Sequence, residues 1–385
     1  MGMHAAAAFG AALTMAVGLG PAMAELAVSA NDGKATLRDG APAVNADVIP
    51  DSVTILDLSS SPPRVVAEVE APASVAGPPV SVAIAPDESF ALVTAAQALD
   101  PADRTKLVPD DKLSVIDLKA NPPRVAATLQ AGRGAAGVSI NRAGTLALVA
   151  NRSEGTVSVF TIKGGALSPA GKIKLGDEKS GPSAIAFTRD GTAAYVTRDG
   201  DDRISVLTVD GDKVEDAKRV LYAGLRPYGI DIAGSGDLAV VANIGRGGGD
   251  IDTISVIDLK AKPSRVVNTV SVGQSPEAVK MSPDGRHVAV VVINGSNRAT
   301  TSPFYNRHSL LQVYRLSGRD LTQVAEAQLG HWCQGAAWSR DGRTLVSQCM
   351  IERELYAFAF DGAKLTPTGT IKLKNGPAAI RTAEP

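Results

Sequence analysis

Hydrophobic and polar residues alternate in short segments along most of the chain, a pattern typical of half-buried β-strands. The clearest segments read VTILDL, LSVIDL, VSVFTI, ISVLTV and ISVIDL, followed by two degenerate copies, LQVYRL and LYAFAF. Equivalent positions in successive copies are 60, 44, 47, 50, 57 and 44 residues apart. Seven copies at such spacing predict a repeat architecture. The equivalent positions are Thr54, Ser114, Ser158, Ser205, Ser255, Gln312 and Tyr356.

Three further strand-like segments lie between consecutive copies, for example RVVNTV, PEAVKM and HVAVVV. The last two are joined by SPDG, a hairpin turn sequence that recurs as APDE, NRAG, TRDG and SRDG. Four antiparallel strands form one propeller blade, and long helical periodicity is scarce. We therefore expect an all-β, seven-bladed β-propeller of four-stranded antiparallel blades. A composite blade, formed by LAVSAND near the start and GPAAIRTAEP at the end, closes the ring.

Several of these segments also carry a family resemblance. TVSVF, TISVIDL, SPDG, AAYVTRDG and AVVANIG resemble the YVTN-repeat seven-bladed propellers of the lactonase-like superfamily. The resemblance covers nearly all of the chain after residue 24. It implies the fold, whereas the functions of this superfamily include lactonases, redox-enzyme subunits and binding proteins.

The first 24 residues have the features of a signal peptide. An apolar run of small and aliphatic residues ends in Pro21 and the small-residue sequence Ala22-Met23-Ala24. We expect residues 1–24 to be removed, leaving a single propeller domain over residues 25–385. We expect this domain to be periplasmic or secreted, with no segment that spans a membrane. Lys and Arg total 39 against 40 Asp and Glu, which argues against a nucleic-acid partner. We expect a monomer.

Loop length suggests which end of the ring binds a ligand. The connections from the outermost strand to the next blade, and from the second to the third strand, share one end, which we call the loop end. Two of these loops, residues 94–111 and 294–309, are much longer than the rest. Arginines that converge there would bind a small anionic molecule or a periplasmic protein, although each could equally form a local surface ion pair. The predicted ligand-binding residues are Arg133, Arg152, Arg198, Arg226, Tyr228, Asn243, Gln334 and Asn375.

His331 and Glu277 are the candidate catalytic residues, because both are expected at this mouth and both types transfer protons. No complete catalytic set is evident in the sequence. The preferred interpretation is therefore a binding or scaffolding propeller. The alternatives are a lactonase-type hydrolase or isomerase acting on an anionic sugar or aromatic-derived lactone, and an accessory subunit of a periplasmic redox enzyme.

The sequence contains little evidence of motifs that bind a metal ion or a cofactor. The four histidines show no metal-ligand spacing, and no Cys-x-x-Cys-His haem motif occurs. The acidic sequence DGDD over residues 199–202 is interpreted as a solvated turn, with calcium as a minor alternative. We predict no metal site and no cofactor.

The two cysteines lie on the two strands of one predicted hairpin. If Ser339 pairs with Arg343 beside the RDG turn, Cys333 and Cys349 lie directly opposite each other. Opposed residues in an antiparallel pair are close enough for a disulfide, and an exported protein meets an oxidising environment. The sequence therefore predicts a Cys333–Cys349 disulfide beside the loop that carries His331.

Overall fold

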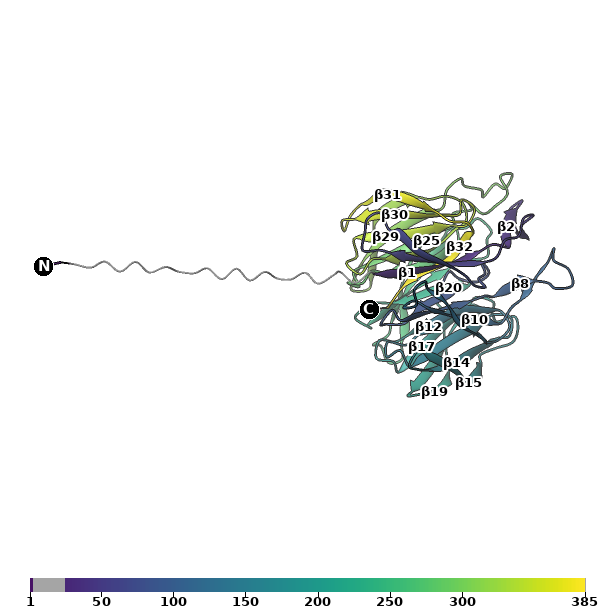
Figure 1. The fold of residues 1–385 in the computed structure, drawn as a ribbon, viewed down its shortest axis with the longest axis horizontal. Helices are drawn as coiled ribbons and strands as arrows, with labels where there is room; N and C mark the ends of the chain where they lie inside the picture. The colour runs from purple at the N-terminus through teal and green to yellow at the C-terminus, as the bar shows by residue number, and fades with distance from the viewer. Residues whose placement is uncertain (3–24, 385) are drawn as a thin grey trace.

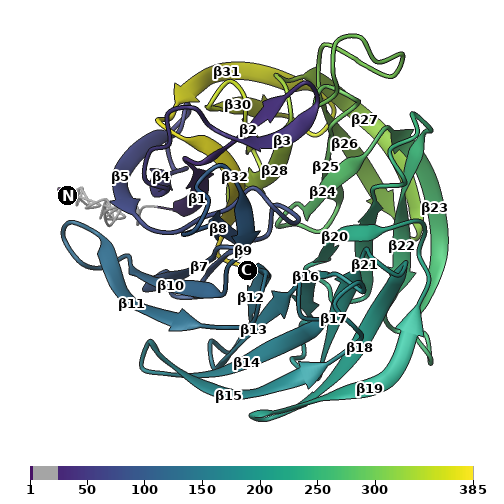
Figure 2. The same ribbon diagram turned by 90° about the vertical axis from the view of Figure 1, so that its right-hand side faces the viewer.

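A computed structural model describes residues 1–2 and 25–384 of the chain, so most of the predicted signal peptide lies outside the described residues. The described part forms 32 β-strands and no helix. Seven four-stranded antiparallel sheets surround a central channel, as Figure 2 shows in a view along the ring axis. The predicted all-β, seven-bladed propeller is confirmed.

Each blade runs from a strand at the channel to a strand at the rim. The composite blade contains β32 (Gly376–Thr382), β1 (Leu26–Asp32), β4 (Ser52–Asp57) and β5 (Arg64–Glu70). The next two contain β6 (Val82–Ile84), β7 (Phe90–Thr94), β10 (Lys112–Asp117) and β11 (Arg124–Gln130), then β12 (Ala135–Ile140), β13 (Leu146–Asn151), β14 (Thr156–Lys163) and β15 (Ala166–Lys174).

Four more blades complete the ring. Two of them contain β16 (Pro182–Phe187), β17 (Ala193–Arg198), β18 (Arg203–Asp210) and β19 (Lys213–Leu221), then β20 (Pro227–Ile232), β21 (Leu238–Asn243), β22 (Asp252–Asp258) and β23 (Arg265–Gly273). The last two contain β24 (Pro276–Met281), β25 (His287–Val292), β26 (Leu310–Ser317) and β27 (Asp320–Gln328), then β28 (Cys333–Trp338), β29 (Thr344–Cys349), β30 (Glu354–Phe360) and β31 (Leu365–Lys372).

Burial follows the distance of a strand from the channel. Every residue of β16, β20, β24 and β28 is buried, whereas the rim strands alternate or are largely exposed. The hydrophobic core consists of layers between neighbouring blades, for example one in which Val291 and Leu311 pack with Trp338 and Phe358. Each blade is therefore stabilised by apolar burial against the next blade around the ring.

The ring is closed as predicted by pairing the two ends of the described chain. Strand β1 pairs with β32 on one side and with β4 on the other, with Ala30 opposite Ala379 and Val53. All three of these residues are fully buried in one core layer. The composite blade therefore leaves no open edge at the junction.

Three insertions project from the loop end, on the side of the molecule marked by β2 and β8 in Figure 1. The segment 94–111 contains the hairpin of β8 (Gln97–Leu99) and β9 (Leu107–Pro109), and residues 294–309 form the second insertion. The third is the hairpin of β2 (Ala35–Arg38) and β3 (Ala41–Val44), which the sequence analysis did not identify as a long loop. Leu37 and Leu107 pack against a small apolar cluster around Trp332, which ties two of these insertions to the blade of the disulfide.

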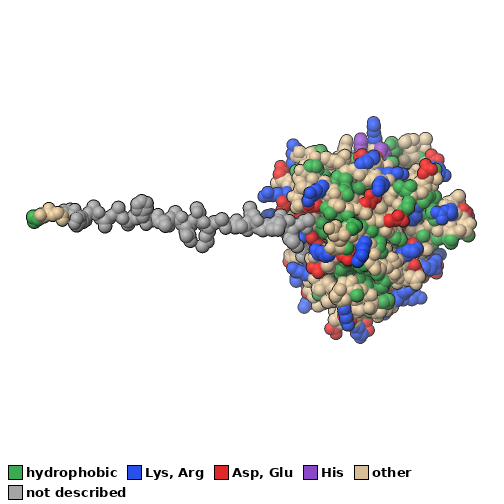
Figure 3. Space-filling view, viewed as in Figure 1, with side chains coloured by type: hydrophobic (Ala, Val, Ile, Leu, Met, Phe, Trp, Pro, Cys, Tyr) green, Lys and Arg blue, Asp and Glu red, His purple; other side chains and the backbone are tan. Residues whose placement is uncertain are grey.

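Charges of both signs are mixed on one face of the molecule. On the face in Figure 3, Lys and Arg side chains are interspersed with Asp and Glu. Within the described residues, no helix has the length and apolarity needed to cross a membrane.

Candidate functional site

Four neighbouring inner strands each place a residue at the same level of the loop end. The second residue of β16, β20, β24 and β28 is Ser183, Tyr228, Glu277 and Gln334 respectively. These strands are neighbours around the channel, and each of the four residues is buried. They form a polar arc at the channel mouth.

A β-bulge presents Glu277 within this arc. In the ladder between β24 and β25, Pro276 pairs with Val292 and Ala278 with Val291, so Glu277 is the extra residue. Bulges of this kind redirect a side chain and are frequent beside active sites. Gly229 on the preceding inner strand allows the close approach, because a Cβ there would meet the backbone oxygen of Glu277 at 2.5 Å.

A buried carboxylate connects two arginines beside the arc. Asp199, immediately after β17, accepts hydrogen bonds from Nη2 of Arg152 and Nη2 of Arg226, both at 2.8 Å. The hydroxyl of Ser183 donates to the same carboxylate at 2.6 Å, and the Arg152 guanidinium lies 5.6 Å from the ring centroid of Tyr228. Side chains from three blades therefore meet at one point.

The electrostatic environment separates the two carboxyl groups of this site. Burial raises the pKa of Glu277 to about 8, although the charges of Arg226 and Arg152 oppose the shift. Burial also disfavours the ionised form of Asp199, but the hydrogen bond and charge of Arg152 outweigh it and lower the pKa of Asp199. Burial raises the pKa of Tyr228. At neutral pH, Glu277 therefore carries a proton and Asp199 is ionised.

The resulting charge favours an anionic ligand. Two guanidinium groups, one carboxylate and one neutral carboxyl leave a net charge of one positive unit. The side chains of Arg152 and Arg226 keep 26% and 32% of their surface exposed. Among the described residues, none donates a hydrogen bond to the buried Oε2 of Glu277. The site can thus bind an anion with its arginines and exchange a proton through Glu277.

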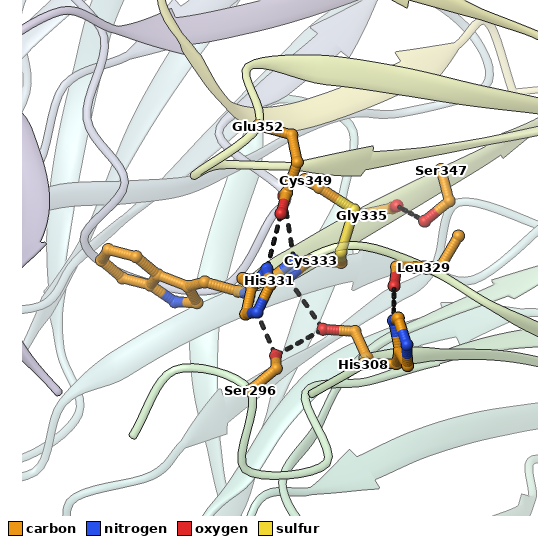
Figure 4. The surroundings of a disulfide bond; sticks show 11 residues. Ser296, His308, Leu329, His331, Cys333, Gly335, Ser347, Cys349 and Glu352 are labelled. Atoms are coloured by element: carbon orange, nitrogen blue, oxygen red, sulfur yellow. Dashed lines mark hydrogen bonds and ion pairs between the residues drawn. A yellow bond between two sulfur atoms is a disulfide. The ribbon is translucent and has the colours of Figure 1, made fainter. Parts of the chain in front are cut away.

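His331 lies in a separate cluster on the loop before β28. Its Nδ1 lies 2.6 Å from Oε1 of Glu352, and its backbone N–H donates to Oε2 of the same carboxylate (Figure 4). Its Nε2 lies 3.4 Å from the hydroxyl of Tyr305. Tyr305 belongs to the long insertion 294–309. The structure thus joins His331 to this insertion and to its own blade.

Cys333 and Cys349 form the predicted disulfide, but the predicted register near the turn was wrong. Trp338 pairs with Leu345, and the Ser339 N–H donates to the carbonyl of Thr344, so the hairpin is offset by one residue from the pairing assumed. A bulge at Gly335, which has φ of 55°, corrects the offset and returns Cys333 opposite Cys349.

The remaining predicted ligand-binding residues divide by their contacts. Gln334 joins the arc, and its Oε1 has no hydrogen-bond partner within the described residues. The others are engaged elsewhere: Arg133 with exposed Glu178, Arg198 with Asp201 and Ser205, Asn243 with Thr253 and Ser255, and Asn375 with Pro50 and Ser52.

Three residues at or beside the site, Asp199, Asp202 and Ser183, were not predicted from the sequence. Asp199 was assigned to a solvated turn, but only 2% of its surface is exposed. Asp202, in the same turn, accepts a hydrogen bond from the backbone of Arg226 and pairs with Arg246. The position of Asp199 in the repeat was the signal that could have identified it. Asp199 directly follows β17, just as the predicted ligand-binding residue Arg152 directly follows β13. Ser183 was missed because a serine at a strand start has many structural uses. No group of three or more His, Cys, Asp or Glu suited to a metal ion occurs among the described residues.

Comparisons with known proteins agree with this architecture. Residues 99–275 match the family described as Lactonase, 7-bladed beta-propeller. The chain is a seven-bladed propeller that resembles this family over that segment. No curated protein matches the sequence significantly.

Solved structures resemble the fold of this chain over most of its length. The periplasmic gluconolactonase of Pseudomonas aeruginosa is 15% identical, with a TM-score of 0.69 over 94% of this chain and 100% of that one. A candidate 6-phosphogluconolactonase from Bacteroides uniformis is 15% identical, with a TM-score of 0.72 over 94% and 99%. Hydrazine synthase of Kuenenia stuttgartiensis is 18% identical, with a TM-score of 0.60 over 81% and 91%. At these identities the likeness concerns the fold alone.

Proposed function

We propose that this lactonase-like propeller hydrolyses a lactone that carries an anionic group, with Glu277 as the proton-transferring residue. The observation that supports this most directly is the position of Glu277, a buried carboxyl on a β-bulge with a pKa raised to about 8 beside two arginines. Such a pKa lies near the operating pH of a general acid or base. The matches to lactonases favour this function over the non-catalytic binding propeller preferred from the sequence.

In the proposed mechanism, the ionised form of Glu277, a minority at neutral pH that grows as the pH approaches about 8, takes a proton from water as the water oxygen bonds to the lactone carbonyl carbon. The negative charge on the carbonyl oxygen is stabilised by a guanidinium of Arg152 or Arg226. The carbonyl then re-forms as the ring C–O bond breaks, and the leaving oxygen takes the proton from Glu277. The product is an open-chain hydroxy acid, and Glu277 is again ionised.

The test compares hydrolysis of glucono-δ-lactone and 6-phosphogluconolactone by the purified chain and its Glu277→Gln variant. We expect a loss of about a hundredfold or more in kcat, because the amide transfers no proton. Glu178→Gln, at an exposed ion pair, is the matched control and should keep full activity. Because Arg152 and Arg226 are positively charged, we expect a lower KM for 6-phosphogluconolactone than for glucono-δ-lactone.

A second variant separates the two clusters. In His331→Ala we expect less than about a tenfold loss, because His331 contacts Glu352 and Tyr305 and the proton is assigned to Glu277. Unchanged hydrolysis in Glu277→Gln, or loss only in His331→Ala, would refute the assignment.

Export through residues 1–24 and a periplasmic or secreted location stay predictions from the sequence.

A further inference from the structure

The channel has a second polar mouth at the end opposite the candidate active site. The tight turns between the first and second strands of the blades lie at this end, which we call the hairpin end. A cavity of about 420 Å³ lies there, bounded by the turns between first and second strands and by Trp338. The last described residues of the chain, Thr382 to Glu384, line the same cavity. Figure 1 shows the C label on the side away from β2 and β8, and Figure 2 shows it at the centre of the ring.

The side-chain carboxylate of Glu384 lies in this mouth. Its Oε1 lies 2.5 Å from Nζ of Lys280, and its Oε2 lies 3.7 Å from Nη2 of Arg189. Lys280 is only 5% exposed and also pairs with Asp231 at 3.2 Å. Burial opposes ionisation of Glu384, but the charge of Lys280 outweighs it and lowers the pKa of Glu384. A buried lysine thus pairs with a carboxylate from the segment that follows β32, 104 positions away in the sequence.

Among the described residues, the charges that line the cavity are equal in number when Glu384 is included. These lining residues comprise four cationic and four acidic side chains. Without Glu384, four cations face three carboxylates, and buried Lys280 keeps Asp231 alone as its acidic partner. A buried cation that loses a partner favours a replacement anion, because desolvation is costly when charge is uncompensated. The cationic residues are Arg142, Arg189, Lys280 and Arg340.

We propose that the hairpin-end mouth is a binding site for small carboxylates, and that Glu384 occupies it as an intramolecular ligand. A free carboxylate binds the same Lys280 when the segment 382–384 withdraws. The site is distinct from the loop-end cluster, and it does not depend on the proposed hydrolase activity.

Chemical rescue tests this inference. In the full chain, Glu384→Ala removes the carboxylate, and we expect the Tm to fall by about 2–4 °C. Acetate, titrated against chloride at constant ionic strength, should restore the lost Tm because it supplies the missing carboxylate. Glu178→Ala removes an exposed carboxylate paired with Arg133 and should show no acetate-specific recovery. Equal acetate responses in the two variants would overturn the proposal.

A fluorescence measurement provides a second readout in the folded protein. Trp338 lines the cavity, and Trp332 lies at the loop end, so Trp332→Phe leaves one tryptophan at this mouth. In that background, Glu384→Ala should increase quenching by iodide about twofold or more relative to neutral acrylamide, because anions are attracted to uncompensated cations. Acetate should reverse the increase. Unchanged iodide quenching would likewise overturn the proposal.

Discussion

Glu277 and Glu352 show how strongly local environment determines the role of one residue type. Glu352 is partly exposed and accepts hydrogen bonds from His331, whereas Glu277 lies on a bulge among buried groups. Burial raises the pKa of Glu277 to about 8 from an ordinary value of 4.5. The fold therefore keeps the carboxyl group of Glu277 neutral at a pH at which the same group would be ionised in water. This lowers the stability of the fold, as is typical of functional sites.

This cost predicts a pH-dependent stabilisation by Glu277→Gln. Between pH 4.5 and about 8 the folded state keeps a proton that the unfolded state releases, so the contribution of Glu277 to stability falls as pH rises through this window. The glutamine variant lacks this dependence. We expect its Tm to exceed that of the parent most at pH 8, and the difference to shrink toward pH 4.5, in thermal scans across this range. A difference independent of pH would contradict the raised pKa.

At the same scale, the sequence predicted in part which residues lie together at the channel mouth. Arg152, Arg226, Tyr228 and Glu277 were expected at the mouth and do meet there. Asp199 was not expected, because a carboxylate in a Gly- and Asp-rich turn normally lies in water. Its burial depends on two arginines from neighbouring blades, and such a contact leaves no local pattern in the sequence.

At the scale of elements, the β28–β29 hairpin shows how a local irregularity sets a long-range pairing. Turn chemistry and the positions of the cysteines were sufficient to predict the disulfide. The register near the turn was wrong by one residue, and the bulge at Gly335 compensated for it. Alternation alone does not locate bulges, since one extra residue changes the register without changing the composition of the strand.

The disulfide predicts a measurable contribution to stability. It joins residues 16 positions apart, and a cross-link of this span stabilises a fold by about 3 kcal/mol through the unfolded state. We expect the double variant Cys333→Ala and Cys349→Ala to lose about 2–4 kcal/mol in urea unfolding while keeping its β-sheet circular dichroism. The parent protein unfolded under reducing conditions is the control and should shift by a similar amount. An unchanged unfolding midpoint in both would argue against the cross-link.

At the scale of the molecule, the repeat determined the architecture. Seven copies, four strands each and a composite blade were all evident from alternation and turn sequences. The β2–β3 insertion was not, because its length is divided between short strands and turns that resemble the rest of the repeat. The ion pair at the hairpin-end mouth was also not predicted, since the contact of Glu384 with Lys280 joins residues 104 positions apart.

Ring closure predicts that a lesion in β1 affects the entire propeller. Ala30→Pro removes a backbone donor in the strand between β32 and β4, and we expect a loss of about 3 kcal/mol or more in a single unfolding transition. Val66→Pro in the same blade is the control, because Val66 is 51% exposed and is the extra residue at a bulge of the rim strand β5. Urea unfolding followed by circular dichroism reports on all the blades, whereas tryptophan fluorescence reports on the neighbouring blade, which carries Trp332 and Trp338. Equal midpoints for the two variants would show that closure at β1 contributes little.

The composite blade also bears on the order of folding events. Strand β1 pairs on its channel side with β32 (Gly376–Thr382), and Ala30 and its partner Ala379 lie about 350 positions apart in the sequence. The entropy of bringing together such distant segments must be overcome before their pairing stabilises the ring. We therefore expect ring closure to be a late and slow step of folding, which pairing within the other six blades precedes.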